Sequence, residues 1–229
     1  MAQIFPRSAN ALARASIFVA LFLAAAGGYA LWTLAHSGYV TRVGIVLQQP
    51  VPFSHDHHVA QIGIDCRYCH TSVERAASAG IPPTQTCMNC HNQIWTNAAI
   101  LEPVRASFRD GKPLTWNRVN DLPDFVYFNH SIHVVKGVAC TTCHGPIDRM
   151  PLMYQGAPLT MKWCLDCHRN PVPNLRPRAE VTNVLWQPPA DLAASQIEWA
   201  RANNVQREVG GSSCHGEGSR MTDLAMRRD

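Results

Sequence analysis

The sequence predicts a mainly α fold with much irregular loop, built on a duplicated unit and preceded by one N-terminal transmembrane helix. Three observations predict this fold class: an uncharged stretch at residues 15–35, a cysteine and histidine motif that occurs four times, and a longer segment that occurs twice. Charged residues make up 16% of the chain and the formal net charge is +4. That charge is too mild to favour nucleic acid as a partner.

Most of the cysteines belong to one motif. Of 9 cysteines, all but Cys214 lie in four Cys-x-x-Cys-His units. Two thiols at this spacing can each add to a vinyl group on one edge of a porphyrin, and the next histidine then lies under the iron. The motifs predict four haems of the c type, attached through Cys66, Cys69, Cys87, Cys90, Cys140, Cys143, Cys164 and Cys167, with His70, His91, His144 and His168 as proximal ligands.

Zinc is the alternative to haem. Cys-x-x-Cys pairs separated by 17 residues, between Cys69 and Cys87, or by 20, between Cys143 and Cys164, would ordinarily suggest a four-thiolate zinc site. The histidine after every pair decides against it. With 11 His in 229 residues, four such histidines would arise by chance about five times in a million. A four-thiolate site has no use for them.

The longer repeated segment supplies further histidines. Phe53-Ser-His-Asp-His-His-Val matches Phe128-Asn-His-Ser-Ile-His-Val, and two motifs follow each copy, at offsets of 74 and 77 residues. Histidines three apart lie on one side of a helical turn, from which they can reach the far side of an iron. This duplicated two-haem unit predicts four distal ligands, His55, His58, His130 and His133. His57 breaks the symmetry, and is expected to be exposed or to bind a further haem.

Residues 15–35 are the predicted membrane anchor. A helix of this length spans roughly 31 Å, enough for the hydrocarbon core. Arg7 and Arg14 precede it and Arg42 follows, which favours residues 1–14 in the cytoplasm and the haem domain outside, in the periplasm. Haem attachment outside the cytoplasmic membrane requires the same orientation. A signal peptide cleaved near Ala24 is the alternative, although the apolar stretch continues beyond a usual signal core.

The rest of the chain divides around the repeat. Residues 36–110 are predicted to form the first two-haem module, residues 111–175 the second, and residues 176–229 a C-terminal extension. The extension is rich in proline up to Pro189 and then carries an amphipathic pattern that predicts a helix at about 191–204.

The extension also contains an incomplete motif. Gly211-Ser-Ser-Cys214-His215 has glycine where a haem motif has its first cysteine. It indicates either a free thiol beside a surface histidine or a fifth haem held by one thioether, with His215 as proximal ligand. The distal ligand of that haem would be His57 or a methionine, for which Met150, Met153 and Met161 are the candidates.

Two segments give the chain a family resemblance. They are Trp116-Asn-Arg-Val-Asn-Asp-Leu-Pro-Asp-Phe-Val-Tyr-Phe-Asn-His-Ser-Ile-His-Val and Leu159-Thr-Met-Lys-Trp-Cys-Leu-Asp-Cys-His-Arg. With the anchor and the motifs, they resemble the multihaem cytochrome c subunit of bacterial alternative complex III over nearly the whole chain. That family is usually pentahaem. Gly211 replaces the first cysteine of its fifth motif, and Asn120 stands where the family has a histidine.

The resemblance implies a role in electron transfer. Such a subunit relays electrons from quinol oxidation in the membrane, through a large iron–sulfur subunit, to a soluble carrier or an oxidase. Its partners would be that iron–sulfur subunit, quinol-binding membrane subunits and a further cytochrome c. No catalytic acid or base is then expected in this chain.

Two other functions are alternatives to the electron relay. A terminal reductase needs an iron with an open position, which the histidine count closes at every complete site. A stand-alone multihaem quinol dehydrogenase that feeds periplasmic reductases is the stronger alternative. It would need a proton acceptor near the membrane, and Asp56 is the candidate.

Overall fold

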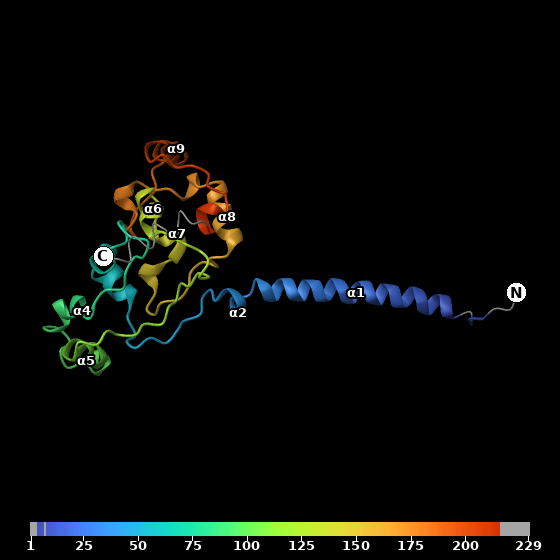
Figure 1. Ribbon diagram of the computed structural model, residues 1–229, viewed down its shortest axis with the longest axis horizontal. Helices are drawn as coiled ribbons and strands as arrows, with labels where there is room; N and C mark the ends of the chain where they lie inside the picture. Colours follow the sequence, from blue (N-terminus) through green and yellow to red (C-terminus); the bar gives the residue numbers. More distant parts are fainter. Residues whose placement is uncertain (1–3, 7, 216–229) are drawn as a thin grey trace. The chain divides into compact units, whose positions relative to one another are not determined.

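In the computed structural model, the structure describes residues 4–6 and 8–215, and the chain divides at residue 42 into two units. In the first unit, helix α1 spans Ala9–Ala35 without a break, and the single turn α2 spans Gly38–Thr41 (Figure 1). The stretch Ala9–Thr41 is long and apolar enough to cross a membrane, by length and composition, a test that a signal sequence also passes. The helix begins six residues before the predicted span, while Arg7 lies outside the described residues.

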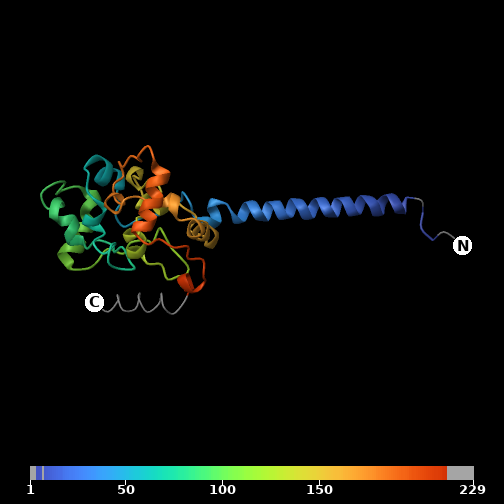
Figure 2. The ribbon, with the colours of Figure 1, turned by 90° about the horizontal axis from the view of Figure 1, so that it is seen from above.

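The second unit consists of short helices joined by long loops (Figures 1 and 2). Within the described residues it has three isolated β-bridges and no strand, which confirms the prediction of a mainly helical fold. The α-helices are α3 (Cys66–Cys69), α4 (Thr84–His91), α5 (Glu102–Asp110), α6 (His130–Val135), α7 (Cys140–His144), α8 (Met161–Arg169), α9 (Leu192–Ala202) and α10 (Ser212–His215). One π-helical turn, Asp56–Gln61, and short 3-10 turns at 99–101, 147–149, 172–174 and 178–180 complete the unit.

Each haem motif lies on one of these short helices, and polar caps place several of them. Asp65 caps α3 by accepting a hydrogen bond from the backbone of Arg67, and Thr160 caps α8 by accepting one from Trp163. Asn129 caps α6, the helix that carries the second pair of predicted distal histidines. Because a capping side chain satisfies an otherwise unpaired backbone N–H, it fixes where the helix begins. The sequence therefore starts these helices at or just before the ligand residues.

The apolar core is thin. One cluster of buried side chains consists of Val51, Leu101 and Val104, and a second consists of Val73, Val134 and Val181. Among the described residues, the largest fully buried side chains are Met150, Leu175 and Val181. A polypeptide core of this size agrees with the expectation that haems contribute most of the buried apolar surface.

Helix α9 agrees with the predicted helix at 191–204 to within two residues. Ile197 is 47% exposed, whereas Gln196 is buried. The Gln196 side chain donates hydrogen bonds to the carbonyls of Pro173, at 2.9 Å, and Leu175, at 3.2 Å. Helix α9 is therefore anchored by a polar contact as well as by apolar packing.

Candidate haem sites

The first pair of predicted distal histidines is held by a phenylalanine. The Phe53 ring stacks on the His58 ring, with centroids 4.4 Å apart and planes at 20°, and meets the His55 ring edge-on at 4.9 Å and 84°. The Nδ1 atom of His58 donates to the carbonyl of Ser54 at 2.8 Å. These contacts fix both rings on the turn that carries them.

The second copy reproduces this arrangement. Phe128 stacks on His133 at 4.4 Å and 27°, and meets His130 edge-on at 4.8 Å and 89°. The Nδ1 atom of His133 donates to the carbonyl of Asn129, again at 2.8 Å. The repeat seen in the sequence is thus also a repeat of side-chain geometry.

Three distal histidines face the histidine of a motif. The ring centroids are 6.3 Å apart for His58 and His91, 6.3 Å for His130 and His144, and 6.0 Å for His133 and His168. Two metal–nitrogen bonds of about 2 Å, with half a ring on either side, add to about 6 Å. The three pairs therefore have the spacing of two imidazoles that bind one iron from opposite faces.

His55 and His70 form the fourth pair by proximity. The pKa of His55 is lowered to about 4, chiefly by burial and next by the neighbouring His70. In the second module the first distal histidine lies opposite the first motif and the second lies opposite the second motif, and His58 and His91 follow the same order in the first module. The structure thus brings together all eight of the histidines predicted for the four complete sites.

Hydrogen bonds fix the tautomer of most of these rings. A backbone carbonyl only accepts, so a histidine whose Nδ1 atom bonds to one carries its proton there, and its Nε2 lone pair is left for a metal. Of the proximal histidines, His70 bonds to Gly80 at 2.7 Å, His91 to Ile94 at 3.3 Å and His168 to Glu208 at 2.8 Å. His130 likewise bonds to Ala77 at 2.7 Å.

Burial keeps several of the rings neutral. It lowers the pKa of His144 to about 4, and it also lowers the pKa of His58, His130 and His133. A neutral ring is the form that binds a metal. The Nδ1 atoms of His55 and His144 are buried and have no partner within the protein. In these two rings, unlike the others, no hydrogen bond from Nδ1 fixes the tautomer.

The cysteines neither pair nor close a metal site. None of the nine forms a disulfide. Burial raises the pKa of the Cys143 thiol to about 12, and a hydrogen bond with Cys66, followed by burial, raises that of Cys140. Within residues 4–6 and 8–215, no three cysteine, histidine or acidic side chains gather around a metal position. The paired imidazoles and adjacent thiols fit haem c, whose porphyrin bridges both.

Two comparisons with known proteins bear on these sites. A family model described as cytochrome c7 and related cytochrome c matches residues 51–103. The multihaem cytochrome c subunit of menaquinone reductase from Nitratidesulfovibrio vulgaris is 30% identical over 181 residues, which cover 68% of this chain and 81% of that protein. The chain belongs to the multihaem cytochrome c family. As a cytochrome c it carries covalently bound haem.

His57 lies at the edge of the second haem site of the cytochrome. Its ring stacks on Trp95, with centroids 5.8 Å apart and planes at 19°, and its Nδ1 atom is 3.1 Å from the Oε1 atom of Gln61. The Gln61 side chain donates in turn to Asp56 at 2.7 Å. His57 is thus half-buried in a local network and not simply exposed.

The incomplete fifth motif adjoins the fourth site of the cytochrome. The Nδ1 atom of His215 donates to the carbonyl of Phe125 at 2.8 Å, and the backbone of Tyr127 donates to the carbonyl of Cys214 at 2.9 Å. Burial, and next the neighbouring Cys214 thiol, raise the pKa of Cys164. His215 is therefore oriented by the same kind of bond as His70, His91 and His168.

The candidate distal ligands of the fifth site differ in burial. Met150 is 0% exposed and belongs to the core, which argues against it as a ligand there, and Met153 is half-buried. Met161 is 70% exposed and begins α8, the helix that carries the fourth motif. Asn120 buries an Oδ1 atom that has no partner in the described part of the chain.

Sequence reasoning missed the residues that close these sites from the C-terminal extension. Thr182 donates from its hydroxyl to Asp65 at 2.9 Å, and the carbonyl of Val181 accepts from the backbone of Cys140 at 3.2 Å. The carbonyl of Glu208 holds His168. Every residue type has a backbone carbonyl, so the sequence does not identify those that accept these bonds. Only Val181 and Thr182, which lie inside a proline-rich stretch, indicate a buried segment.

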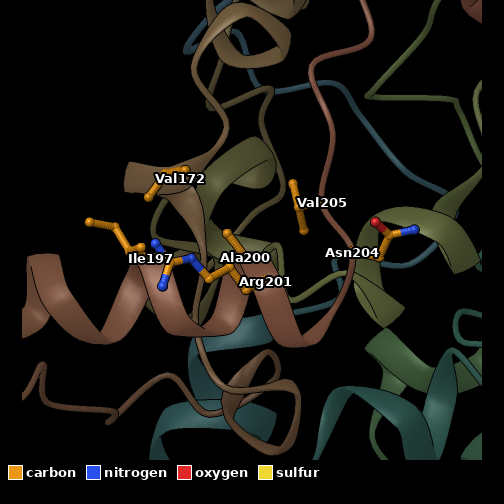
Figure 3. Close-up of a pocket in the computed structure, with 6 residues that line it drawn as sticks. All are labelled: Val172, Ile197, Ala200, Arg201, Asn204 and Val205. Carbon is orange, nitrogen blue, oxygen red and sulfur yellow. The ribbon is translucent and has the colours of Figure 1, made fainter.

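One cavity lies away from the predicted iron ligands. It has a volume of about 410 Å³ and lies between α9 and the turn Val172–Asn174 (Figure 3). Val172, Ile197, Ala200, Arg201, Asn204 and Val205 line it. None of these residues is a predicted ligand, so the cavity is separate from the haem chemistry of the cytochrome.

Proposed function

We propose that this cytochrome relays electrons through four haems with two histidine ligands each, as a subunit of a membrane complex that exchanges electrons with quinone. The single observation that carries the proposal is the spacing of 6.0 to 6.3 Å in three facing histidine pairs. When bound, the haems would supply one-electron transfer. The protein's own side chains hold each iron on both faces and so exclude substrates from it.

Membership of a larger complex is inferred from the similar protein of Nitratidesulfovibrio vulgaris. That protein belongs to a menaquinone reductase. We therefore propose that this chain is also a subunit of a membrane complex. The resemblance to alternative complex III supports its partners: an iron–sulfur subunit, quinol-binding membrane subunits, a further cytochrome c, and a soluble carrier or oxidase. Alternative complex III is our specific assignment, in which electrons leave quinol. A complex like the relative's would return them to quinone, so the direction of electron flow separates the two.

The location proposed for the haem domain is the periplasmic face of the cytoplasmic membrane. Helix α1 supports a single-pass anchor with the N-terminus inside, and haem attachment supports the outer location. A chain purified from membranes with α1 intact, shown by its N-terminal sequence, is the expected result. A mature chain that begins after Ala26 would instead show a cleaved signal peptide.

A fifth haem is part of the proposal. Cys214 would hold it by one thioether, with His215 as proximal ligand and the exposed Met161 as distal ligand. The Nδ1 bond from His215 to Phe125 at 2.8 Å supports this assignment. A haem with one free vinyl group also absorbs at longer wavelength as its pyridine haemochrome, which distinguishes it from the other four.

The haem count tests both parts of the proposal. The mass of the denatured chain gives the number of covalent haems, and Cys214→Ala is the control. Five in the native chain and four in Cys214→Ala are expected. Four haems in both chains would contradict the fifth haem alone. No haem in either chain, with zinc bound instead, would overturn the whole assignment. Carbon monoxide should leave the spectrum of the four histidine-ligated haems unchanged, and binding at one of them would favour a reductase.

The stand-alone quinol dehydrogenase remains the second candidate. It requires Asp56 as proton acceptor, and that carboxylate already accepts a hydrogen bond from Gln61 at 2.7 Å. Quinol oxidation by the purified chain, lost in Asp56→Asn, would favour this candidate. Activity only in the presence of partner subunits would favour the relay.

A further inference from the structure

Trp95 adopts a backbone conformation that its residue type disfavours. Its φ angle is +54°, in the left-handed region, where a bulky side chain is an outlier. Such a conformation persists only where the surroundings hold it, and it often marks a functional position. The side chain is 60% exposed, so burial does not account for it. The ring contacts of Trp95 are the remaining explanation.

Those contacts connect Trp95 to the second haem site. Its ring stacks on His57, at 5.8 Å and 19°, and lies near the predicted proximal ligand His91, at 6.4 Å and 45°. The turn after α4 sets this geometry, because the backbone of Ile94 donates to Cys90 at 3.0 Å and that of Ala98 donates to Trp95 at 3.1 Å.

His91 needs this contact more than His70 and His168 do. Its Nδ1 atom is 3.3 Å from the carbonyl of Ile94, whereas the corresponding bonds are 2.7 Å for His70 and 2.8 Å for His168. A bond at 3.3 Å constrains a ring poorly. Packing against Trp95 therefore contributes to the direction of the His91 ring plane.

The second module has no counterpart of the stacked Trp95 and His57 rings. At the offsets of the repeat, Val172 corresponds to Trp95 and Ile132 corresponds to His57. Val172 lines the cavity beside α9 (Figure 3), and Ile132 is 55% exposed. His168, the counterpart of His91, is held instead by the distant carbonyl of Glu208. The pair of Trp95 and His57 thus belongs to the first module alone.

The ring planes of the histidine pairs also differ. They cross at 71° for His58 and His91, at 52° for His133 and His168, and at 3° for His130 and His144. Parallel imidazoles donate into the same iron d orbital and separate it in energy from its neighbour. Crossed imidazoles donate into both of these d orbitals and leave their energies nearly equal. The two arrangements give different electronic centres from the same ligands.

We propose that Trp95, supported by His57, positions the His91 ring so that the second haem has crossed axial imidazoles and is electronically distinct from the third haem. The inference rests on the proposed function, which assigns His58 and His91 to one iron. Trp95 acts through His91 and is a positioning residue. Because its apolar ring lies 6.4 Å from the His91 ring, it would also leave less water near the iron, and this would raise the reduction potential because water favours the more highly charged ferric state.

Trp95→Gly tests the proposal in the full-length, haem-loaded protein. Glycine adopts a positive φ without strain, so the turn is retained and only the ring is lost. Electron paramagnetic resonance of the oxidised protein should show a highly anisotropic low-spin signal from the second haem. The double variant Cys87→Ala, Cys90→Ala identifies that signal by its loss. In Trp95→Gly the signal should move towards the rhombic type, and one component of the redox titration should shift to more negative potential.

The controls separate orientation from simple stability. Trp95→Phe retains an aromatic ring and should restore both the signal and the potential, and Val172→Ala at the matching position should change neither. An unchanged signal and potential in Trp95→Gly would overturn the inference while the haem count keeps the proposed function intact. A Trp95→Gly chain with one haem fewer would also overturn it, because Trp95 would then be needed for attachment. An unchanged haem count in the double cysteine variant would overturn the proposed function itself.

Discussion

The two haem modules share a ligand geometry but differ in their surroundings. Phe53 and Phe128 hold their histidine pairs at nearly the same distances and angles. Yet Cys90 in the first module is exposed, whereas its counterpart in the second module, Cys167, is half-buried. The comparison teaches that the ligand geometry is local to the repeat, while the environment is supplied from elsewhere in the chain.

The C-terminal extension supplies that environment unequally. Val181 packs with Val73 and Val134 and so contacts both modules. Leu175, which precedes the extension and is 1% exposed, bridges to Val138, and Glu208 holds His168. The extension therefore closes the second module more completely. We expect substitutions at matching positions to cost more there than in the first module.

Removal of a proximal histidine should show the largest difference. His144→Ala should lose one haem and lower the free energy of unfolding by about 3 kcal/mol, because it leaves a cavity at a buried site. His91→Ala should also lose one haem but cost about 1 kcal/mol, because its site is more open. Haem content and chemical denaturation followed by circular dichroism measure both. Equal losses of stability in the two variants would contradict the inference that the extension covers the second module more completely.

A second matched pair lies at the glycine after each pair of distal histidines. Gly63 and Gly137 have φ angles of +81° and +92°. A Cβ atom at Gly63 would meet nothing within 4 Å, but at Gly137 it would lie 2.5 Å from the carbonyl oxygen of Arg176. Gly63→Ala should cost about 1 kcal/mol, from backbone strain alone. Gly137→Ala should cost about 3 kcal/mol, since the extension must also move. Thermal unfolding of both variants checks the difference.

Thr182→Val should weaken the contact between the extension and the first module. The substitution removes the hydroxyl that donates to Asp65 at 2.9 Å, with little change in shape. The expected loss is about 1 kcal/mol, as for a typical hydrogen bond. Exposed Thr71→Val is the control and should be close to neutral. A loss in the control as large as that in Thr182→Val would show that the hydrogen bond is not the cause.

The smallest expected effect is a pH dependence at Asp65. A hydrogen bond from Arg67 is the main cause that lowers the pKa of Asp65 to about 2, from 3.8. Because the folded pKa lies below the unfolded one, the stabilisation is complete above about pH 4 and is lost as the pH falls towards about 2. Solvent screening keeps it below about 1 kcal/mol. The stability difference between the native chain and Asp65→Asn should therefore shrink over that range, and a constant difference would contradict it.

The sequence predicted the fold class because the chemistry of haem attachment demands fixed spacings. The mainly helical fold is confirmed, and α9 lies where the pattern at 191–204 placed it. The haem ligands stay predictions, although the structure brings them into facing pairs. The pairing itself could not be read from the sequence, because either distal histidine of a module could reach either motif. Gln196 and Glu208 escaped prediction for a different reason: their contacts involve backbone carbonyls, which every residue type has.

The hydrogen bond between Thr182 and Asp65 has a consequence for biosynthesis. The two residues are 117 positions apart in the chain. A ribosome makes the chain from its N-terminus, so Asp65 and the adjacent Cys66 emerge long before the segment that covers them. The first attachment motif therefore stays accessible to the haem-attaching machinery during most of translation. Its closure by Val181 and Thr182 comes late, after all four complete motifs have been synthesised.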